Sequence, residues 1–202
     1  MEKGNLDRVE KALEPVLKKG LRNGVFSGVA VGVYRFRNCK EERLLVNQGR
    51  TRSDEQGKTI RRDTFFDLAS LTKPFCTALS ILCLIHKNEI DWNTKIFDIL
   101  SSFIFNNEYR DITVEQLLTH SAGLIAYKPV YQSYAPLPGN EKKEQLIQEF
   151  LQEPLAYLPG FSCLYSDIGF ILLGALIEKV SGTTLDNFFR NEIVNPLHIQ
   201  ES

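Results

Sequence analysis

The sequence predicts an α+β protein in which an N-terminal helix and a β-hairpin come before a mostly helical region. Three patterns lead to this prediction. Apolar side chains from Leu6 to Leu21 recur at three- and four-residue steps, as on one face of a helix. Residues 29–48 instead alternate as strands do, and the patterned segments after residue 65 return to helical spacing. We therefore expect a region 1–64 that holds the helix and part of an antiparallel sheet, and a helical region 65–202.

The first region is expected to contain a helix over 6–21 and an antiparallel hairpin. Pro15 lies in the middle of the helix, where a ring without an N–H group predicts a kink or a break. Valines alternate with small residues from Val29 to Phe36, and a second strand is expected over 43–48, after a polar turn at 37–42. The small residues on one face predict close packing there. Because two strands alone are marginally stable, the hairpin needs further strands or a covering helix.

The second region is expected to consist of helices joined by loops. One helix should begin at Ser70. The stretch Thr113-Val114-Glu115-Gln116 has the form of a capping box, so another should run from there to His120 and be closed by Gly123. The irregular stretch 126–139, with three prolines and three tyrosines, is expected to line a cleft. Further helices are predicted over 78–86, 96–100, 141–153, 168–180 and 185–193.

Composition and charge argue against several classes of function. Lysine and arginine (24) balance aspartate and glutamate (25), and no basic run is interleaved with aromatic residues, so nucleic-acid binding is not expected. No apolar run approaches the roughly 20 residues of a membrane span. The N-terminus lacks the apolar core of an export signal, so we expect a cytoplasmic protein. Four cysteines without a Cys-x-x-Cys pair, and three histidines at no metal-ligand spacing, indicate buried free thiols without a metal, cofactor or disulfide framework.

Ser70 and Lys73 are the first candidates for a chemical role. Three residues apart on a helix, they share one face, so the lysine amine can lie against the serine hydroxyl. A serine hydroxyl is a poor nucleophile at neutral pH. A neighbouring amine, kept neutral by desolvation or by another cation, is one way to remove its proton. The alternative is structural, with Ser70 as the helix cap and Lys73 solvated in the first turn.

Two further motifs follow Ser70-Leu71-Thr72-Lys73 along the chain. They are His120-Ser121-Ala122-Gly123-Leu124 and Tyr165-Ser166-Asp167, the second followed by an apolar helix. A short sequence that also bears on the comparison below precedes each motif. These sequences are Phe66-Asp67-Leu68-Ala69, Leu117-Leu118-Thr119 and Pro159-Gly160. Over nearly its whole length the chain resembles the serine β-lactamase-like superfamily, in the branch of class C β-lactamases, serine esterases and D-amino-acid-peptide hydrolases. The resemblance implies a β-lactamase/transpeptidase-like fold.

The resemblance implies a serine hydrolase that works in two acyl-transfer steps on an ester, an amide or a D-amino-acid peptide. Ser70 would attack a carbonyl to form an acyl-enzyme, which water or another acceptor would release. Lys73 would hold the serine hydroxyl and help to take its proton. Tyr165 matches the first residue of the family's Tyr-x-Asn motif and would pass a proton to the leaving group. That role requires a nearby cation to lower a phenolic pKa that is normally about 10.

Asp167 stands where the family usually has asparagine, and it is expected to bind substrate. An ionised carboxylate only accepts hydrogen bonds, whereas an amide also donates, so a substrate carbonyl loses its donor there. This weighs against β-lactam recognition more than against hydrolysis. His120 is not a general base on this interpretation. In the last turn of a helix it is expected to interact with the helix dipole as a cation.

The family's third motif, a Lys or His followed by Ser or Thr and Gly on a strand, is absent from the sequence. The resemblance places one of two oxyanion-binding N–H groups on that strand, and loss of one such donor costs about 10² to 10³ in turnover. We therefore expect the N-terminal part of a longer hydrolase or a truncated relative, impaired as it stands, with an unpaired sheet edge that favours self-association. The alternative is a non-catalytic binding or assembly module that retains the fold.

Overall fold

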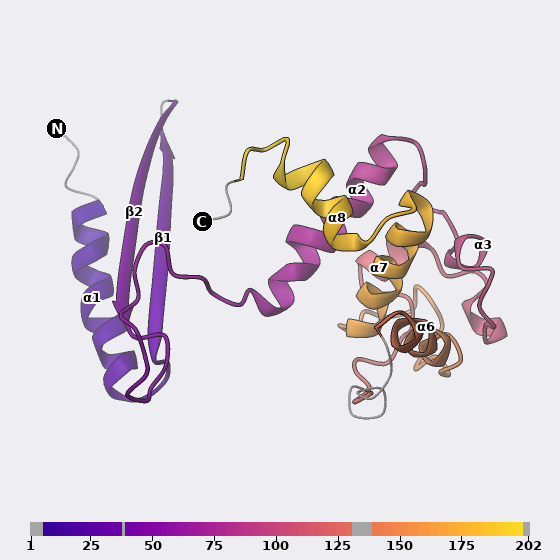
Figure 1. Ribbon diagram of the computed structural model, residues 1–202, viewed down its shortest axis with the longest axis horizontal. Coiled ribbons are helices and arrows are strands. Elements are labelled where there is room, and N and C mark those ends of the chain that lie inside the picture. The colour runs from indigo at the N-terminus through magenta and orange to yellow at the C-terminus, as the bar shows by residue number, and fades with distance from the viewer. Residues whose placement is uncertain (1–5, 38, 131–138, 200–202) are drawn as a thin grey trace. The chain divides into compact units, whose positions relative to one another are not determined.

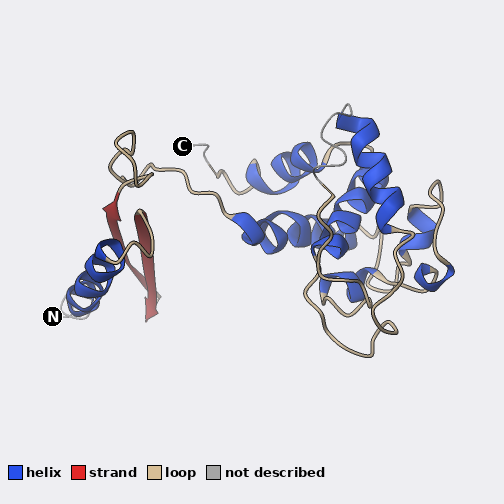
Figure 2. Cartoon of the chain, turned by 90° about the horizontal axis from the view of Figure 1, so that it is seen from below, coloured by secondary structure: helices blue, strands red, loops and turns tan. Residues whose placement is uncertain are grey.

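The computed structural model describes residues 6–37, 39–130 and 139–199, in an α+β arrangement (Figures 1 and 2). The backbone forms two compact units, the first ending at Asp67 and the second beginning at Leu68. The predicted division placed this boundary after residue 64. Each unit has its own packing.

The first unit is a helix along a two-stranded antiparallel sheet (Figure 1). Helix α1 spans Leu6–Arg22, strand β1 spans Gly28–Arg37 and strand β2 spans Lys40–Gly49, with Val31 opposite Val46. The predicted hairpin is confirmed, but its turn is tighter than expected, because the start of β2 takes up part of the polar stretch. Pro15 does not break α1. It lies on the exposed side of the helix, where water can bind the carbonyl that a proline leaves without a donor.

The two faces of the hairpin differ in exposure. Leu44 and Val46 turn toward the protected face, whereas Tyr34 and Phe36 are 70% and 79% exposed on the other. The prediction of close packing against the small residues is wrong for Ala30 and Gly32, because both are exposed and the nearest described atom to a Cβ added at Gly32 is Tyr34 Cε2, at 3.4 Å. In the described residues the sheet contains β1 and β2 alone. Self-association through this face or its edges stays a prediction.

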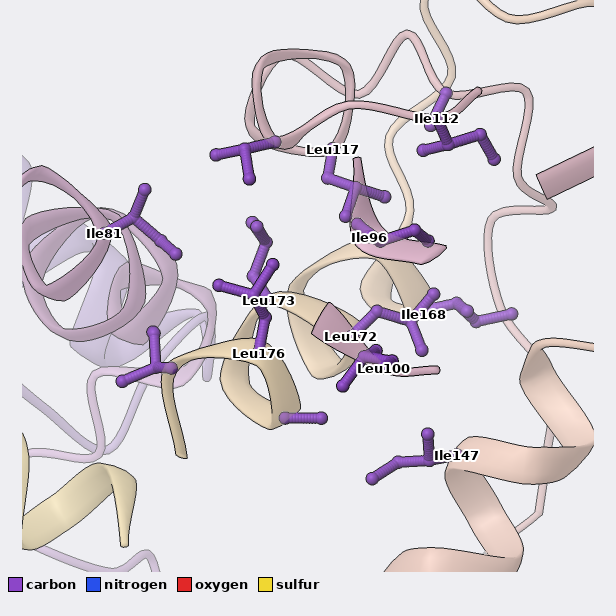
Figure 3. Packing of buried hydrophobic residues seen from close by; sticks show 14 of the residues in the cluster. Ile81, Ile96, Leu100, Ile112, Leu117, Ile147, Ile168, Leu172, Leu173 and Leu176 are labelled. Carbon is purple, nitrogen blue, oxygen red and sulfur yellow. The ribbon is translucent and has the colours of Figure 1, made fainter. Parts of the chain in front are cut away.

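The second unit is built from short helices around one long one. Its elements are η1 (Ala69–Leu71), η2 (Lys73–Ala78), α2 (Leu79–His86), α3 (Ile96–Ile99), η3 (Asn107–Tyr109), α4 (Val114–Leu118), α6 (Gly139–Phe150), α7 (Asp167–Ser181), α8 (Leu185–Phe189) and η4 (Arg190–Val194). Helix α7 is central, because every residue from Leu172 to Ile177 is buried. Leu172, Leu173 and Leu176 meet side chains from the surrounding helices in one core (Figure 3). The predicted capping box of Thr113 and Gln116 is present at the start of α4.

Two helix ends differ from the prediction. Ser70 does not cap a regular helix, because it lies inside the 3-10 turn η1, which runs into the π-helical turns of η2 before α2 begins. Helix α4 ends at Leu118, so Gly123 does not close it. His120 takes a left-handed backbone conformation two residues after the helix, with φ of 58°. Gly123 has φ of 83° in the following loop, where an added Cβ would collide with the Tyr157 carbonyl.

The expectation of buried thiols needs correction for two of the four cysteines. The thiols of Cys39, Cys76, Cys83 and Cys163 are free, but Cys39 and Cys163 are exposed rather than buried. By length and composition alone, the described helices include one run that could cross a membrane, Ala69–His86, or two if the bent pair Asp167–Ser181 and Leu185–Val194 counts as one. The run Ala69–His86 contributes Ile81 and Leu84 to the core. A helix buried in a protein core meets the same criteria of length and composition as a membrane span.

Candidate active site

Ser70 lies exposed at the beginning of the second unit, directly after a strained residue. Ala69 has a left-handed backbone with φ of 45°, a conformation that costs an L-residue about 1 to 2 kcal/mol. Such strain tends to collect at functional sites. Lys73 follows one turn later, at the start of η2, and its Nζ lies 3.5 Å from Ser70 Oγ. The predicted shared face of Ser70 and Lys73 is therefore present, although the turn between them is not a regular α-helix.

The start of α7 brings the third motif residue to the same place. Ser166 is the N-cap of α7, since its Oγ accepts a hydrogen bond from the Gly169 N–H at 3.4 Å. The same hydroxyl donates to the Ile125 carbonyl at 2.7 Å, and the Asp167 N–H donates to the Ala126 carbonyl at 3.0 Å. These bonds hold the beginning of α7 against the loop that follows α4, and they fix where Tyr165 and Asp167 project.

Lys73 and Asp167 form an ion pair at the centre of the site. Lys73 Nζ lies 2.5 Å from Asp167 Oδ1, and the lysine side chain is only 15% exposed. Burial alone would lower the pKa of the Lys73 amine. Hydrogen bonds to Asp167 and Tyr165, with their charges, outweigh that effect and raise the pKa above its ordinary value. The amine is therefore a cation at neutral pH, which differs from the neutral base that Ser-x-x-Lys alone suggested.

Tyr165 lies beside this cation. Lys73 Nζ is 4.9 Å from the centre of the Tyr165 ring. Hydrogen bonds to Lys73 and to Ser70 lower the pKa of the Tyr165 phenol, against the opposing effects of burial and of the Asp167 carboxylate. A lowered phenolic pKa makes a tyrosine a better proton acceptor near neutral pH. The cation that the sequence prediction required for this residue is thus supplied by Lys73.

His120 is also a member of the site, although the sequence predicted a role for it at the helix dipole. Its Nδ1 accepts a hydrogen bond from the Ser166 N–H at 3.1 Å, and its ring centre lies 4.6 Å from that of Tyr165 and 5.1 Å from that of Phe170. Burial, followed by the charge of Lys73, lowers the pKa of His120. A neutral imidazole that accepts at Nδ1 is not the helix-capping cation that we expected.

A cavity of about 610 Å³ opens beside Ser70, Lys73 and Asp167. Its other walls are mainly apolar, and they include Tyr127, Val130, Phe150, Ile168, Phe170 and Leu185. The prediction that 126–139 lines a cleft therefore holds for its first part. The rest of that stretch, 131–138, lies outside the described residues. A mainly apolar pocket with a few converging polar groups is typical of a small-molecule site.

A family model described as Beta-lactamase matches residues 13–202 of the sequence. The chain belongs to the beta-lactamase family. Its fold is accordingly shared with solved members. A structure titled "Crystal structure of a class C beta lactamase" superimposes with a TM-score of 0.79 at 16% identity, covering 99% of this chain and 52% of that one.

Relatives of this beta-lactamase family member include penicillin-binding proteins and hydrolases. Penicillin-binding protein 4* of Bacillus subtilis is 29% identical over 147 residues, which is 72% of this chain and 32% of that protein. A structure titled "EstCE1, a hydrolase with promiscuous acyltransferase activity" gives a TM-score of 0.77 at 24% identity, covering 95% of this chain and 52% of that one. The chain spans about a third of the length of the curated relatives it matches.

The beta-lactamase family is one of serine hydrolases. An exposed hydroxyl, a cation and a phenol of lowered pKa converge beside a cavity. The predicted residues Ser70, Lys73, Tyr165 and Asp167 are all brought together by η1, η2 and the start of α7. The described part of the second unit contains no named β-strand, so the third motif has no counterpart there.

Proposed function

We propose that this chain carries the nucleophile half of a serine hydrolase that acts through an acyl-enzyme on an ester, an amide or a D-amino-acid peptide. The convergence of Ser70, Lys73 and Tyr165 is the observation that carries this proposal. Ser70 is exposed beside the cavity, so a carbonyl carbon can approach its Oγ. Lys73 supplies a fixed positive charge, and Tyr165 supplies the proton acceptor.

In the first step, Ser70 Oγ forms a bond to the substrate carbonyl carbon while its proton passes to the Tyr165 phenolate oxygen. The bond between that carbon and the leaving group then breaks, and the leaving group takes the proton from Tyr165. This leaves Ser70 as an ester. In the second step water attacks the ester carbon, Tyr165 takes a proton from the water, and Ser70 Oγ leaves with that proton. Lys73 stabilises the phenolate in both steps, which is how a cation activates a nearby base.

Asp167 makes the charge of this site neutral where a lysine alone would leave it positive. Its carboxylate is paired with Lys73 at 2.5 Å, and it presents acceptors to the cavity but no donor. A substrate that carries a carboxylate near its scissile bond therefore meets no net positive charge to bind it. We therefore propose uncharged esters or amides as the preferred substrates, with β-lactams as poor ones.

We further propose that the 202-residue chain turns over slowly after acylation. An oxyanion hole with one backbone N–H from Ser70 and one from a strand would have only the first in the described second unit. One missing donor costs about 10² to 10³ in turnover. Labelling of Ser70 is then a more sensitive test than a turnover assay, since labelling needs only one attack by the serine.

The test is intact-mass spectrometry after incubation with a fluorophosphonate. Attack by a serine oxygen on phosphorus expels fluoride and leaves one stable adduct on an activated serine. We expect one adduct on the parent chain, none on Ser70→Ala, and one on the matched control Ser162→Ala, which changes an exposed serine in the loop before Tyr165. An adduct that persists in Ser70→Ala would refute the assignment of the nucleophile. The absence of any adduct from the folded parent would favour a non-catalytic binding module.

A further inference from the structure

His120, in the loop after α4, accepts hydrogen bonds from both sides of Tyr165, in addition to the bonds that Ile125 and Ala126 make to Ser166 and Asp167. The Ser166 N–H donates to His120 Nδ1 at 3.1 Å, and the Leu164 N–H donates to the His120 carbonyl at 3.0 Å. The Tyr157 hydroxyl also donates to that carbonyl, at 3.2 Å. Tyr165 thus lies between two residues whose N–H groups are both bound by His120. The left-handed backbone of His120 is what turns its carbonyl and its ring toward the same segment.

We propose that His120 is a positioning residue that holds Tyr165 against Lys73 through its unprotonated Nδ1, and that a proton on this ring releases the Tyr165 segment. The inference rests on the proposed function of Ser70 and Tyr165 for its consequence in catalysis. Its structural part stands on the hydrogen bond from Ser166 and on the stacking of His120 against Tyr165.

The chemistry of the imidazole makes this contact dependent on pH. Neutral imidazole can accept at Nδ1 only while the other nitrogen carries the proton, and imidazolium donates at both nitrogens. Protonated His120 would therefore present an N–H group to the N–H group of Ser166. Ser166 is 3% exposed, so water does not readily replace the lost acceptor. The bond from Ser166 to Nδ1 is lost, and Tyr165 is then positioned only by the remaining bonds of Leu164, Ser166 and Asp167 to the loop.

The groups around the ring oppose its protonation. Lys73 approaches from η2 with a positive charge, and it disfavours a second cation, as does burial of the ring. Asp167, at the start of α7, acts in the other direction but is paired with Lys73. Tyr165 contributes its ring, and Tyr157 contributes a hydroxyl to the backbone of His120. The balance lowers the pKa of His120 from its ordinary value, so the contact is intact at neutral pH and is lost only when the pH falls through that lowered pKa.

Two substitutions separate the acceptor from the backbone conformation. Asparagine and glycine both tolerate a left-handed φ, so neither adds backbone strain at residue 120. Asparagine places an amide oxygen near the position of Nδ1 and does not titrate, whereas glycine has no acceptor. At pH 8 we expect His120→Asn to keep the fluorophosphonate labelling rate within about threefold, and His120→Gly to lose about tenfold, the factor that corresponds to one buried hydrogen bond.

The pH profile is the measurement that a purely structural role would not change. Tyr165 must lose one proton to act, so the labelling rate of the parent should fall about tenfold per pH unit below the phenolic pKa. Below the His120 midpoint a second proton removes the hydrogen bond that His120→Gly also lacks, so the parent should show one additional fall of about tenfold in total. His120→Asn has no imidazole to protonate and should keep the slope of about tenfold per unit without the additional fall. Equal slopes in the parent and His120→Asn would overturn the proposal.

A second readout does not depend on hydrolysis. In ¹⁵N-labelled protein, the amide of Ser166 should titrate together with the ring of His120, and this shared midpoint should vanish in His120→Asn. If Ser70 is never labelled but the Ser166 amide follows His120, the proposed function fails and the positioning role stands. If Ser70 is labelled and the Ser166 amide does not respond over the pH range in which the His120 ring titrates, the positioning role is wrong and the proposed function stands.

Discussion

Replacing Ser166 by alanine should destabilise the second unit by about 2 kcal/mol, because this one hydroxyl makes two structural bonds. It caps α7 at the Gly169 N–H and donates to the Ile125 carbonyl at 2.7 Å. Loss of a serine cap typically costs about 1 kcal/mol. A partly buried carbonyl left without its donor costs about 1 kcal/mol more, the low end of the usual range, since some water reaches Ile125.

Urea unfolding followed by tryptophan fluorescence measures this change. Trp92 is the one tryptophan of the chain and lies in the second unit, so its emission reports on that unit. With a slope of about 1 to 3 kcal/mol per molar urea, a loss of 2 kcal/mol lowers the midpoint by about 1 M. Ser162→Ala, in an exposed part of the preceding loop, should leave the midpoint unchanged. A shift below about 0.3 M for Ser166→Ala would contradict a structural role for both bonds.

Two substitutions test the chemistry directly. Tyr165→Phe removes the proton acceptor while keeping the ring against His120, so the fluorophosphonate labelling rate should fall about 10² to 10⁴-fold with unchanged circular dichroism. A fall of less than tenfold would assign the proton to another group. Asp167→Asn removes a carboxylate that raises the pKa of both Lys73 and Tyr165. The labelling rate of Asp167→Asn should therefore reach its plateau at a lower pH than that of the parent, and an unshifted profile would contradict this electrostatic account.

Local sequence patterns predicted most of the elements. The alternation in 29–36 and 43–48 yields the hairpin, and the Thr113 capping box starts α4, because both signals act within a few residues. The apolar stretch after Asp167 yields the buried α7, since a helix that is apolar on nearly all sides has to be buried. Ser70 and Lys73 lie on one face as predicted, although Ser70 is in a 3-10 turn and not in an α-helix. One turn of either helix is about three to four residues long.

The orientation of His120 and the backbone of Ala69 were not predicted, because they depend on the tertiary structure and not on a local sequence pattern. His120 was expected in the last turn of α4, whereas the helix stops at Leu118 and the ring turns toward Ser166, 46 residues away. A capping box marks the start of a helix but not its length. Likewise, no local pattern predicts the left-handed backbone of Ala69, which is set by how the chain enters η1. The available signal for the role of His120 was its place at the predicted end of a short helix, three residues before Gly123.

The charge of Lys73 distinguishes the two ways in which this site can work. If the amine is the base, arginine cannot replace it, because guanidinium does not lose its proton in proteins. If the amine is a fixed cation that stabilises the Tyr165 phenolate, as its raised pKa indicates, arginine keeps the required charge.

We therefore expect Lys73→Arg to label with fluorophosphonate about tenfold more slowly than the parent, because the fork of arginine fits the pocket of Lys73 less well. Lys73→Met, which keeps the length of the side chain without its charge, should lose about 10³-fold. Equal inactivity of both folded variants would make Lys73 the base and would reverse the proposed roles of Lys73 and Tyr165. If Lys73→Arg alone keeps its labelling rate, the carboxylate of Asp167 is compatible with catalysis. In that case Asp167 keeps Lys73 charged, as its role requires, and does not inactivate a base.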